Sequence, residues 1–89
     1  MSREELFDAC FEKWGIESQV LMVIEEMGEL SQALARYLNG RKHNAMEELA
    51  DVSLMLEQLV YIMGRAEVSH IQEEKIKRIW ERLELEKEE

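Results

Sequence analysis

Two short acidic segments, EEMGEL and EELADV, contain the residues best suited to chemistry. Each has two acids three positions apart: Glu26 and Glu29 in the first, Glu48 and Asp51 in the second. On a helix, this spacing places both carboxylates of a pair on the same side. Carboxylate oxygens are the ligands that Mg²⁺ and Mn²⁺ prefer. The four acids are therefore candidate ligands for a divalent cation.

The charges around these acids distinguish a metal site from an ordinary solvated face. One such pair is common on any charged helix and has little meaning alone. Here, however, no Lys or Arg occurs between Lys13 and Arg36, or between Lys42 and Arg65. Like charges at helical spacing destabilise a helix by about 0.2–0.5 kcal/mol per pair. A bound cation would offset this repulsion.

The second acidic pair is predicted to face inward. Glu48 and Asp51 fall on the same helical stripe as Met55, Leu59 and Ile62. Buried carboxylates need a partner or they take up protons. The sequence has no cysteine pair, and neither histidine stands at ligand spacing with these acids, which argues against zinc.

The chain is predicted to be all-α. It has no proline, only four glycines, and many strong helix formers. Four helices are expected, from about Ser2 to Trp14, Glu17 to Leu38, Asn44 to Met63, and Ser69 to Lys87. The second and third helices are joined by a short loop and should pack antiparallel, which would bring the acidic pairs together. The predicted fold is a four-helix antiparallel bundle, with residues 1–89 as one domain.

Helix starts and surface charges are also predicted. Capping boxes are expected at Ser2 with Glu5, Asn44 with Glu47, and Ser69 with Gln72. On the last helix, opposite charges four positions apart are expected to pair, namely Glu73–Lys77, Glu74–Arg78 and Arg82–Glu86.

Length and apolar content together predict a homo-oligomer. A chain of 89 residues buries only about 60% of its unfolded surface, so its own core is marginal. Hydrophobic residues nevertheless make up 46% of the sequence. The third helix is apolar on nearly every side from Val52 to Met63. We expect part of that surface to be covered by a partner chain.

Charge and targeting signals exclude several classes of partner. The net charge of −9 argues against binding to a nucleic-acid polymer or an anionic membrane. Cys10 is the single cysteine, so no intramolecular disulfide forms, and a reducing compartment is expected. Cys10 is predicted to be a core residue rather than a nucleophile. The acidic, polar start and the lack of a long apolar run predict a cytoplasmic protein.

The two motifs together resemble a known signature. EExxE, followed after 18 residues by ExxD, resembles the motif pair of the MazG-like all-α nucleoside triphosphate pyrophosphohydrolases. The flanking sequences EEMGELSQAL and EELADVSLML are similar as well, and the resemblance extends from about Glu17 to Arg82. It implies a homodimer or a dimer of dimers. It also implies hydrolysis of ribo- or deoxyribonucleoside triphosphates to monophosphate and pyrophosphate, as in nucleotide-pool cleansing.

The resemblance also implies roles for the acids. Glu26, Glu29, Glu48 and Asp51 match the ligands of Mg²⁺, for which Mn²⁺ can substitute. Phosphoryl transfer mainly needs charge neutralisation and alignment, which metal ions supply. A carboxylate that the metal does not fully use can orient the attacking water. Either Glu25 or Glu29 fits this catalytic role, and both remain candidates.

Candidate substrate contacts lie on other helices. The stretch KIKR in the last helix is similar to a basic stretch that follows the acidic motifs in this family. Lys75 and Arg78 are therefore candidate phosphate contacts, with ordinary surface salt bridges as the alternative. Trp14 ends the first helix just before the motif helix and is the candidate to stack on a base. The loop from Arg41 to Asn44 is a further candidate contact.

Two alternative functions are retained. Phosphoribosyl-ATP pyrophosphohydrolase is of similar size and also carries acidic helical motifs, but the segment VSLMLEQLV after Asp51 does not resemble that family. The second alternative is a non-catalytic helical dimerisation or regulatory module, in which the acids face solvent. Stabilisation by a divalent metal would favour the enzyme over this module.

Overall fold

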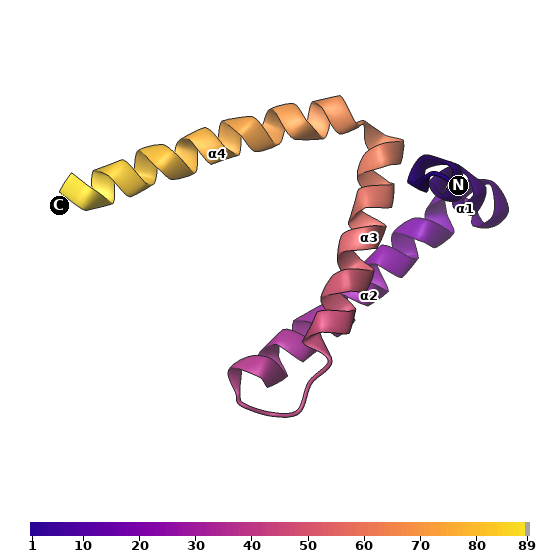
Figure 1. Ribbon diagram of the computed structural model, residues 1–89, viewed down its shortest axis with the longest axis horizontal. Helices are drawn as coiled ribbons and strands as arrows, with labels where there is room; N and C mark the ends of the chain where they lie inside the picture. Colours follow the sequence, from indigo (N-terminus) through magenta and orange to yellow (C-terminus); the bar gives the residue numbers. More distant parts are fainter. Residues whose placement is uncertain (89) are drawn as a thin grey trace.

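The chain folds into four α-helices connected by short segments (Figure 1). The computed structural model describes residues 1–88, and no strand occurs among them. The helices are α1 (Arg3–Trp14), α2 (Ile16–Leu38), α3 (Ala45–Met63) and α4 (Arg65–Glu88). The all-α prediction is confirmed over this range. The predicted ends of the first three helices agree with the structure to within one residue.

Glycines set two of the three helix junctions. Gly15 (φ +80°) separates α1 from α2, and Gly64 (φ +132°) separates α3 from α4. Both backbones are in a region that side chains disfavour, so one residue is enough to change the chain direction. The fourth helix therefore begins directly after Gly64. The predicted start at Ser69 is wrong, because that residue lies inside α4.

The helix α1 begins as predicted. The Ser2 hydroxyl accepts a hydrogen bond from the backbone N–H of Glu5 at 3.1 Å and donates to its carboxylate at 3.3 Å. Polar contacts then attach α1 to α3. Arg3 donates to Glu57 at 2.7 Å, and the Tyr61 hydroxyl donates to Asp8 at 2.9 Å. These contacts fix the position of α1 on α3.

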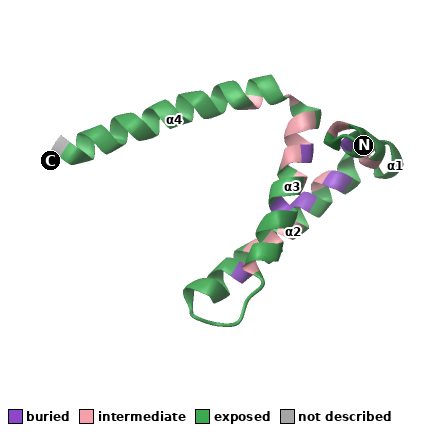
Figure 2. Ribbon diagram, in the orientation of Figure 1, coloured by how far each residue is buried: buried purple, intermediate pink, exposed green. Residues whose placement is uncertain are grey.

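Helices α1, α2 and α3 share the core, and α2 and α3 run antiparallel (Figures 1 and 2). The buried apolar residues, each on one of these three helices, are Phe7, Val23, Ala33 and Val52. The buried polar residues are Gln19 and Gln58. The core is small, as the chain length predicts. It extends along the contact between α2 and α3, and Phe7 adds to it from α1.

Helix α4 leaves the other helices and extends away from them (Figure 1). From Ser69 to Lys87, every side chain of α4 is exposed (Figure 2). Within the described chain, only the start of α4 contacts other helices: it packs against α3, and Arg65 pairs with Glu4 of α1 at 3.0 Å. The four helices therefore do not form a bundle in a single protomer. Of the predicted ion pairs, Arg82–Glu86 forms at 3.1 Å, whereas Glu74 pairs with His70 at 3.5 Å.

The shape leaves an unusually large surface. The accessible area is 7591 Å², whereas a compact monomer of this mass exposes about 5,500 Å². The radius of gyration is 16.9 Å, against about 12 Å for a compact domain of this length. Part of this surface is an apolar stripe on α4 made of Ile76, Ile79, Trp80 and Leu83, all exposed.

None of the helices in the described range has the length and apolar character that crossing a lipid bilayer requires.

Candidate metal centre

Three carboxylates converge where α2 passes the first turn of α3. Glu26, Glu29 and Glu48 each contribute one oxygen, and these oxygens lie within 4.8 Å of one another. Asp51, one turn further along α3, is close enough to Glu26 for their charges to repel. We call these four residues the acidic cluster. The offset between the antiparallel helices therefore brings the two predicted pairs together.

The acidic cluster has an inner and an outer side. Glu26 and Glu48 are half-buried, and in each the Oε2 atom is inaccessible to solvent and has no hydrogen-bond partner. Glu29 and Asp51 are exposed. An ionised carboxylate oxygen without solvent or a partner is costly to bury. Two such oxygens facing an open side with further carboxylates fit the requirements of a divalent cation.

Electrostatic repulsion within the cluster is also visible at Glu26. Its pKa is raised above the ordinary value of 4.5, first by burial and then by the charges of Glu29, Asp51 and Glu48. Among the described residues, no Lys or Arg forms an ion pair with any of the four acids. The oxygens therefore have no cationic partner within the chain.

This arrangement predicts a pH-dependent stability in metal-free protein. Because the folded pKa of Glu26 exceeds the unfolded one, the native state retains a proton that the unfolded state has released. The contribution of Glu26 to stability therefore falls as pH rises from about 4.5 through the raised pKa. We expect Glu26→Gln to stabilise the metal-free protein at pH 7 and to lose this advantage towards pH 4.

Chemical denaturation of both proteins across this pH range, with chelator present, measures the difference. Glu47→Gln is the control, because Glu47 is an exposed acid on α3, directly before Glu48, and does not belong to the acidic cluster. A pH-independent difference between wild type and Glu26→Gln would contradict the prediction.

The loop before α3 orients Glu48. The Asn44 side-chain amide donates to Glu48 Oε1 at 3.0 Å, which leaves Oε2 as the oxygen without a partner. The predicted capping by the Asn44 side chain is wrong, since His43 Nδ1 instead accepts a hydrogen bond from the N–H of Ala45 at 3.2 Å. The sequence pattern at Asn44 predicts only a helix cap. The four-residue spacing of Asn44 from Glu48 also allows the side-chain hydrogen bond that the structure shows.

We expect Asn44→Ala to weaken metal binding by roughly 10–100-fold, as is typical when a group that holds a metal ligand is lost. Calorimetric titration with Mn²⁺ measures this affinity. Asn39→Ala is the matched control, because Asn39 lies at the other end of the same loop and donates to Ala35 O at 2.9 Å. Equal affinities for the two variants would show that Asn44 does not position Glu48.

Two further residues of the α2 motif, Glu25 and Gly28, lie outside the acidic cluster. Glu25 is exposed and is not among the converging oxygens, so its predicted role as a base stays a prediction. At Gly28, an added Cβ would meet nothing within 4 Å. This glycine therefore does not serve close helix packing within the chain. It leaves open space beside Glu29.

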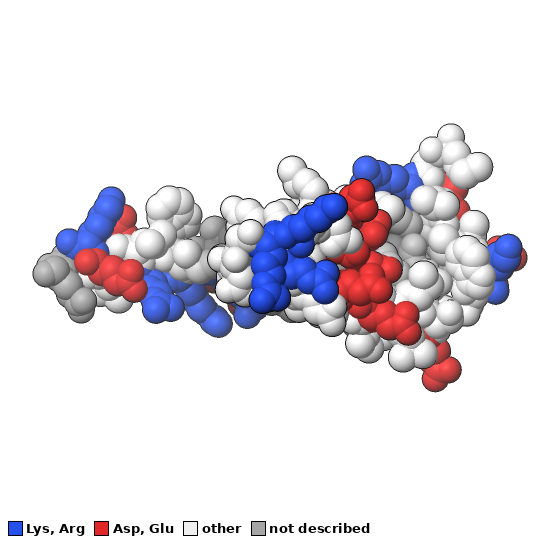
Figure 3. Space-filling view, turned by 90° about the horizontal axis from the view of Figure 1, so that it is seen from below, with Lys and Arg blue, Asp and Glu red and all other residues white. Residues whose placement is uncertain are grey.

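Basic side chains lie next to the acidic cluster, but they are not the ones on α4. Lys75 and Arg78 lie on the extended part of α4, which does not approach the acids within this chain. Figure 3 shows a group of Lys and Arg side chains beside a band of Asp and Glu, at the end of the molecule where the α2–α3 loop lies. The basic residues of that end are Arg36, Arg41 and Lys42, here called the basic patch.

The basic patch has no acidic partner. None of its three residues forms an ion pair with a described residue. Arg36 follows Glu29 by seven residues, which places it on the same side of α2 about 10 Å further along. The Arg41 N–H donates to the Arg36 carbonyl at 2.9 Å and fixes the start of the loop. Arg36 was not predicted as a candidate phosphate contact, although its seven-residue spacing from Glu29 indicates the same side of the helix.

Trp14 lines a cavity of about 420 Å³ between α1, α2 and α3. Its side chain is 53% exposed, and the Lys13 ammonium lies over its ring at 5.3 Å. The half-buried Cys10 lines the same cavity. Trp14, at the end of α1, and Cys10, predicted to be a core residue, therefore both line a space large enough for a small ligand.

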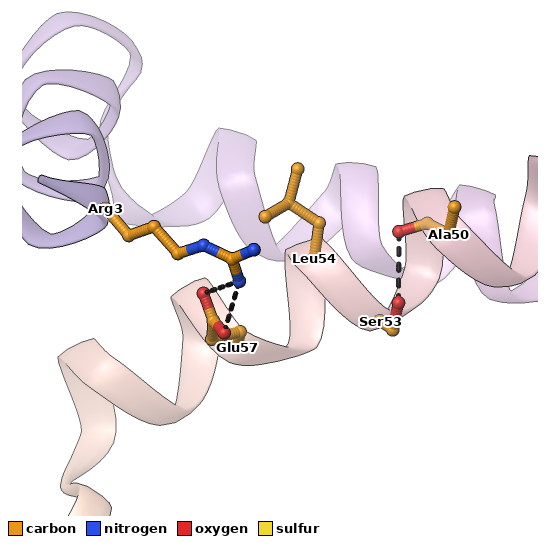
Figure 4. Close-up of a pocket in the computed structure, with 5 residues that line it drawn as sticks. All are labelled: Arg3, Ala50, Ser53, Leu54 and Glu57. Atoms are coloured by element: carbon orange, nitrogen blue, oxygen red, sulfur yellow. Dashed lines mark hydrogen bonds and ion pairs between the residues drawn. The ribbon is translucent and has the colours of Figure 1, made fainter. Parts of the chain in front are cut away.

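A second depression, of about 380 Å³, lies beside α3 and contains Arg3, Ser53 and Glu57 (Figure 4). Its polar groups already have partners. Arg3 binds both oxygens of Glu57, at 2.7 and 2.9 Å, and the Ser53 hydroxyl donates to the Ala50 carbonyl at 3.1 Å. This depression is therefore an anchor for α1 rather than a binding site.

Fold and site describe an all-α protein in which two antiparallel helices bring several carboxylates close together. Comparison with known proteins finds no matching protein-family model, no matching curated protein and no matching solved structure. Functional assignment therefore depends on the geometry of the site and on the two motifs.

Proposed function

We propose that this protein is a Mg²⁺-dependent nucleoside triphosphate pyrophosphohydrolase that releases nucleoside monophosphate and pyrophosphate. One observation carries the proposal: carboxylate oxygens of Glu26, Glu29 and Glu48 converge, and in Glu26 and Glu48 the Oε2 atom has neither solvent nor a hydrogen-bond partner. The similarity of the two motifs to the MazG-like family supports the same reaction. Mn²⁺ is expected to substitute for Mg²⁺.

The positions of the four acids suggest which side of the metal site each would occupy. Glu26 and Glu48 would hold the cation from the buried side, and Glu29 and Asp51 from the exposed side. When bound there, a divalent cation would supply neutralisation of phosphate charge and a more acidic water. Glu25 and Glu29 are exposed towards solvent, where either can accept a proton from the attacking water.

The basic patch would supply positive charge for the phosphates that the metal ion does not neutralise. A triphosphate carries negative charge along its whole length, and the cation neutralises only one part of it. Arg36, Arg41 and Lys42 lie beside the acids and have no partner within the described chain. These residues would hold the departing pyrophosphate. Lys75 and Arg78 remain candidates for the same task if α4 of a partner chain covers the site.

We further propose that the bundle is completed by α4 of a second copy, in a homodimer or a dimer of dimers. The excess exposed area, about 2,000 Å² per chain, is of the size that obligate homodimers bury. The apolar stripe of α4 has no cover within the described protomer. Antiparallel α2 and α3 already form half of a four-helix arrangement.

The decisive experiment is a product assay with all common ribo- and deoxyribonucleoside triphosphates and phosphoribosyl-ATP. We expect equal amounts of monophosphate and pyrophosphate in Mg²⁺ and none in chelator. Hydrolysis of phosphoribosyl-ATP alone would favour the related pyrophosphohydrolase. Folded oligomer that neither binds Mn²⁺ nor yields product would establish the non-catalytic helical module, which the exposed stripe of α4 also fits.

A further inference from the structure

We infer that the buried amide pair Gln19–Gln58 reads the edge of a nucleobase in the cavity between α1, α2 and α3. This inference rests on the proposed function, and it names the residues that set base preference. Neither glutamine belongs to the acidic motifs, and the resemblance assigns them no role.

The amide pair is an unusual component of so small a core. Gln58 Nε2 donates to Gln19 Oε1 at 2.6 Å, and the two residues are 8% and 4% exposed. The other buried side chains of the described chain are apolar. Two apolar residues of the same shape would make this contact at no cost in unsatisfied hydrogen bonds. A buried amide pair therefore indicates a role other than stability.

The pair retains hydrogen-bonding capacity. A glutamine amide has two N–H donors and one carbonyl acceptor. Gln19 Nε2 meets only the sulfur of Met22, at 3.7 Å, which is a weak acceptor. The Gln58 carbonyl accepts no hydrogen bond from any described residue. The hydrogen-bonded pair therefore keeps one free donor and one free acceptor, which are the groups that a base edge with a carbonyl and an N–H requires.

The surrounding cavity suits a flat ring. Both glutamines line the 420 Å³ space together with Trp14, Met22 and Met55. Small-molecule sites in proteins occupy about 300–1,000 Å³ and combine apolar walls with a few placed polar groups. An indole ring and two polarizable thioethers are favourable contacts for an aromatic base.

The register of α2 and α3 connects this cavity to the acidic cluster. Gln19 precedes Glu26 by seven residues on α2, and Gln58 follows Asp51 by seven residues on α3. On each helix, seven residues return to the same side about 10 Å away. Because the helices are antiparallel, both steps lead in the same direction. One nucleotide would thus place its phosphates at the acids and its base at the amides.

The two methionines occupy the interval between these positions. Met22 lies four residues before Glu26, and Met55 lies four residues after Asp51. Both line the cavity. In this arrangement, Met22 and Met55 would contact the C–H groups of the sugar, which are apolar.

Gln19→Met and Gln58→Met keep the side-chain length and remove the amide. For each variant, kcat/KM should be measured with every substrate base. We expect the preferred base to lose roughly 10–100-fold relative to the others, while Mn²⁺ affinity stays unchanged. Ser53→Ala, in the anchor depression on the other part of α3, is the control and should keep the wild-type preference. An unchanged base preference in both glutamine variants would overturn the inference and leave the pyrophosphohydrolase proposal intact.

A binding measurement on native protein separates the two proposals further. Side-chain amide signals of Gln19 and Gln58, assigned with the methionine variants, should shift in nuclear magnetic resonance spectra when the preferred nucleoside monophosphate is added. Shifts without any hydrolysis would uphold the amide pair and overturn the proposed reaction. Unshifted amide signals at saturating monophosphate would overturn the amide pair, even if hydrolysis occurs.

Discussion

Glu48→Gln is expected to reduce pyrophosphate release by on the order of 10³-fold, equivalent to about 4 kcal/mol of transition-state stabilisation. Glu48 contributes one of the three converging oxygens, and its Oε2 has neither solvent nor a hydrogen-bond partner. Glutamine keeps the shape and one carbonyl oxygen but removes the charge that attracts the cation. The amide nitrogen of glutamine is also a hydrogen-bond donor, and it cannot coordinate a cation as a carboxylate oxygen does. Both changes act against Mg²⁺.

Thermal unfolding tests the same substitution without a substrate. A ligand at a hundred times its dissociation constant stabilises a native protein by about 2.7 kcal/mol. For a domain of this size, this corresponds to a rise in Tm on the order of 10 °C. We expect wild type to show this rise with Mn²⁺ or Mg²⁺ and Glu48→Gln to show almost none.

The metal-free variant provides an internal check on folding. Since Glu48→Gln removes a charge from a cluster without cations, it should be at least as stable as wild type in chelator. Glu47→Gln makes the same chemical change on an exposed neighbour and should keep both activity and the metal-induced rise. A Glu48→Gln protein with normal activity, or with a normal rise in Tm, would refute the metal centre.

Ile79→Lys is expected to dissociate the proposed oligomer and, with it, to abolish the proposed activity. Ile79 lies in the middle of the apolar stripe of α4 and is 57% exposed in the protomer. Burying an isoleucine contributes about 1.5–3 kcal/mol, and a two-fold symmetric dimer loses this contribution twice. The dissociation constant should therefore rise by roughly 10²–10⁴-fold.

Sedimentation velocity over a range of protein concentrations measures this change. Glu81→Lys is the control, because two residues along a helix turn the side chain by about 200° to the opposite side of α4. That variant should sediment as wild type does. If Ile79→Lys kept the wild-type oligomer, the stripe would not be the interface, and the proposed bundle of two chains would be wrong.

The helices and the acidic cluster were predictable because both depend on local periodicity. The absence of proline and the few glycines define three of the four helices to within one residue. Acids three positions apart share a helix side, and the short loop forces α2 and α3 to run antiparallel. Glu26, Glu29 and Glu48 therefore converge as predicted, with Asp51 at the edge of the cluster.

Features that depend on the register between helices were not predictable. The distance between Gln19 and Gln58 depends on how far α3 is offset along α2. No periodicity within one helix encodes this offset. The direction of α4 was missed for a different reason. The pattern shows that α4 has an apolar side, but it does not show whether the same chain or another one covers it.

The extended α4 has a consequence for how the protein responds to its own abundance. In the proposed assembly, folding and association are one equilibrium, so the free energy of unfolding depends on protomer concentration. Each tenfold dilution lowers that free energy by about 1.4 kcal/mol of dimer. Activity would then fall more steeply than in proportion to the amount of protein, and a cell that makes few copies would keep little of the active form. For this chain, expression level would itself act as a control on catalysis.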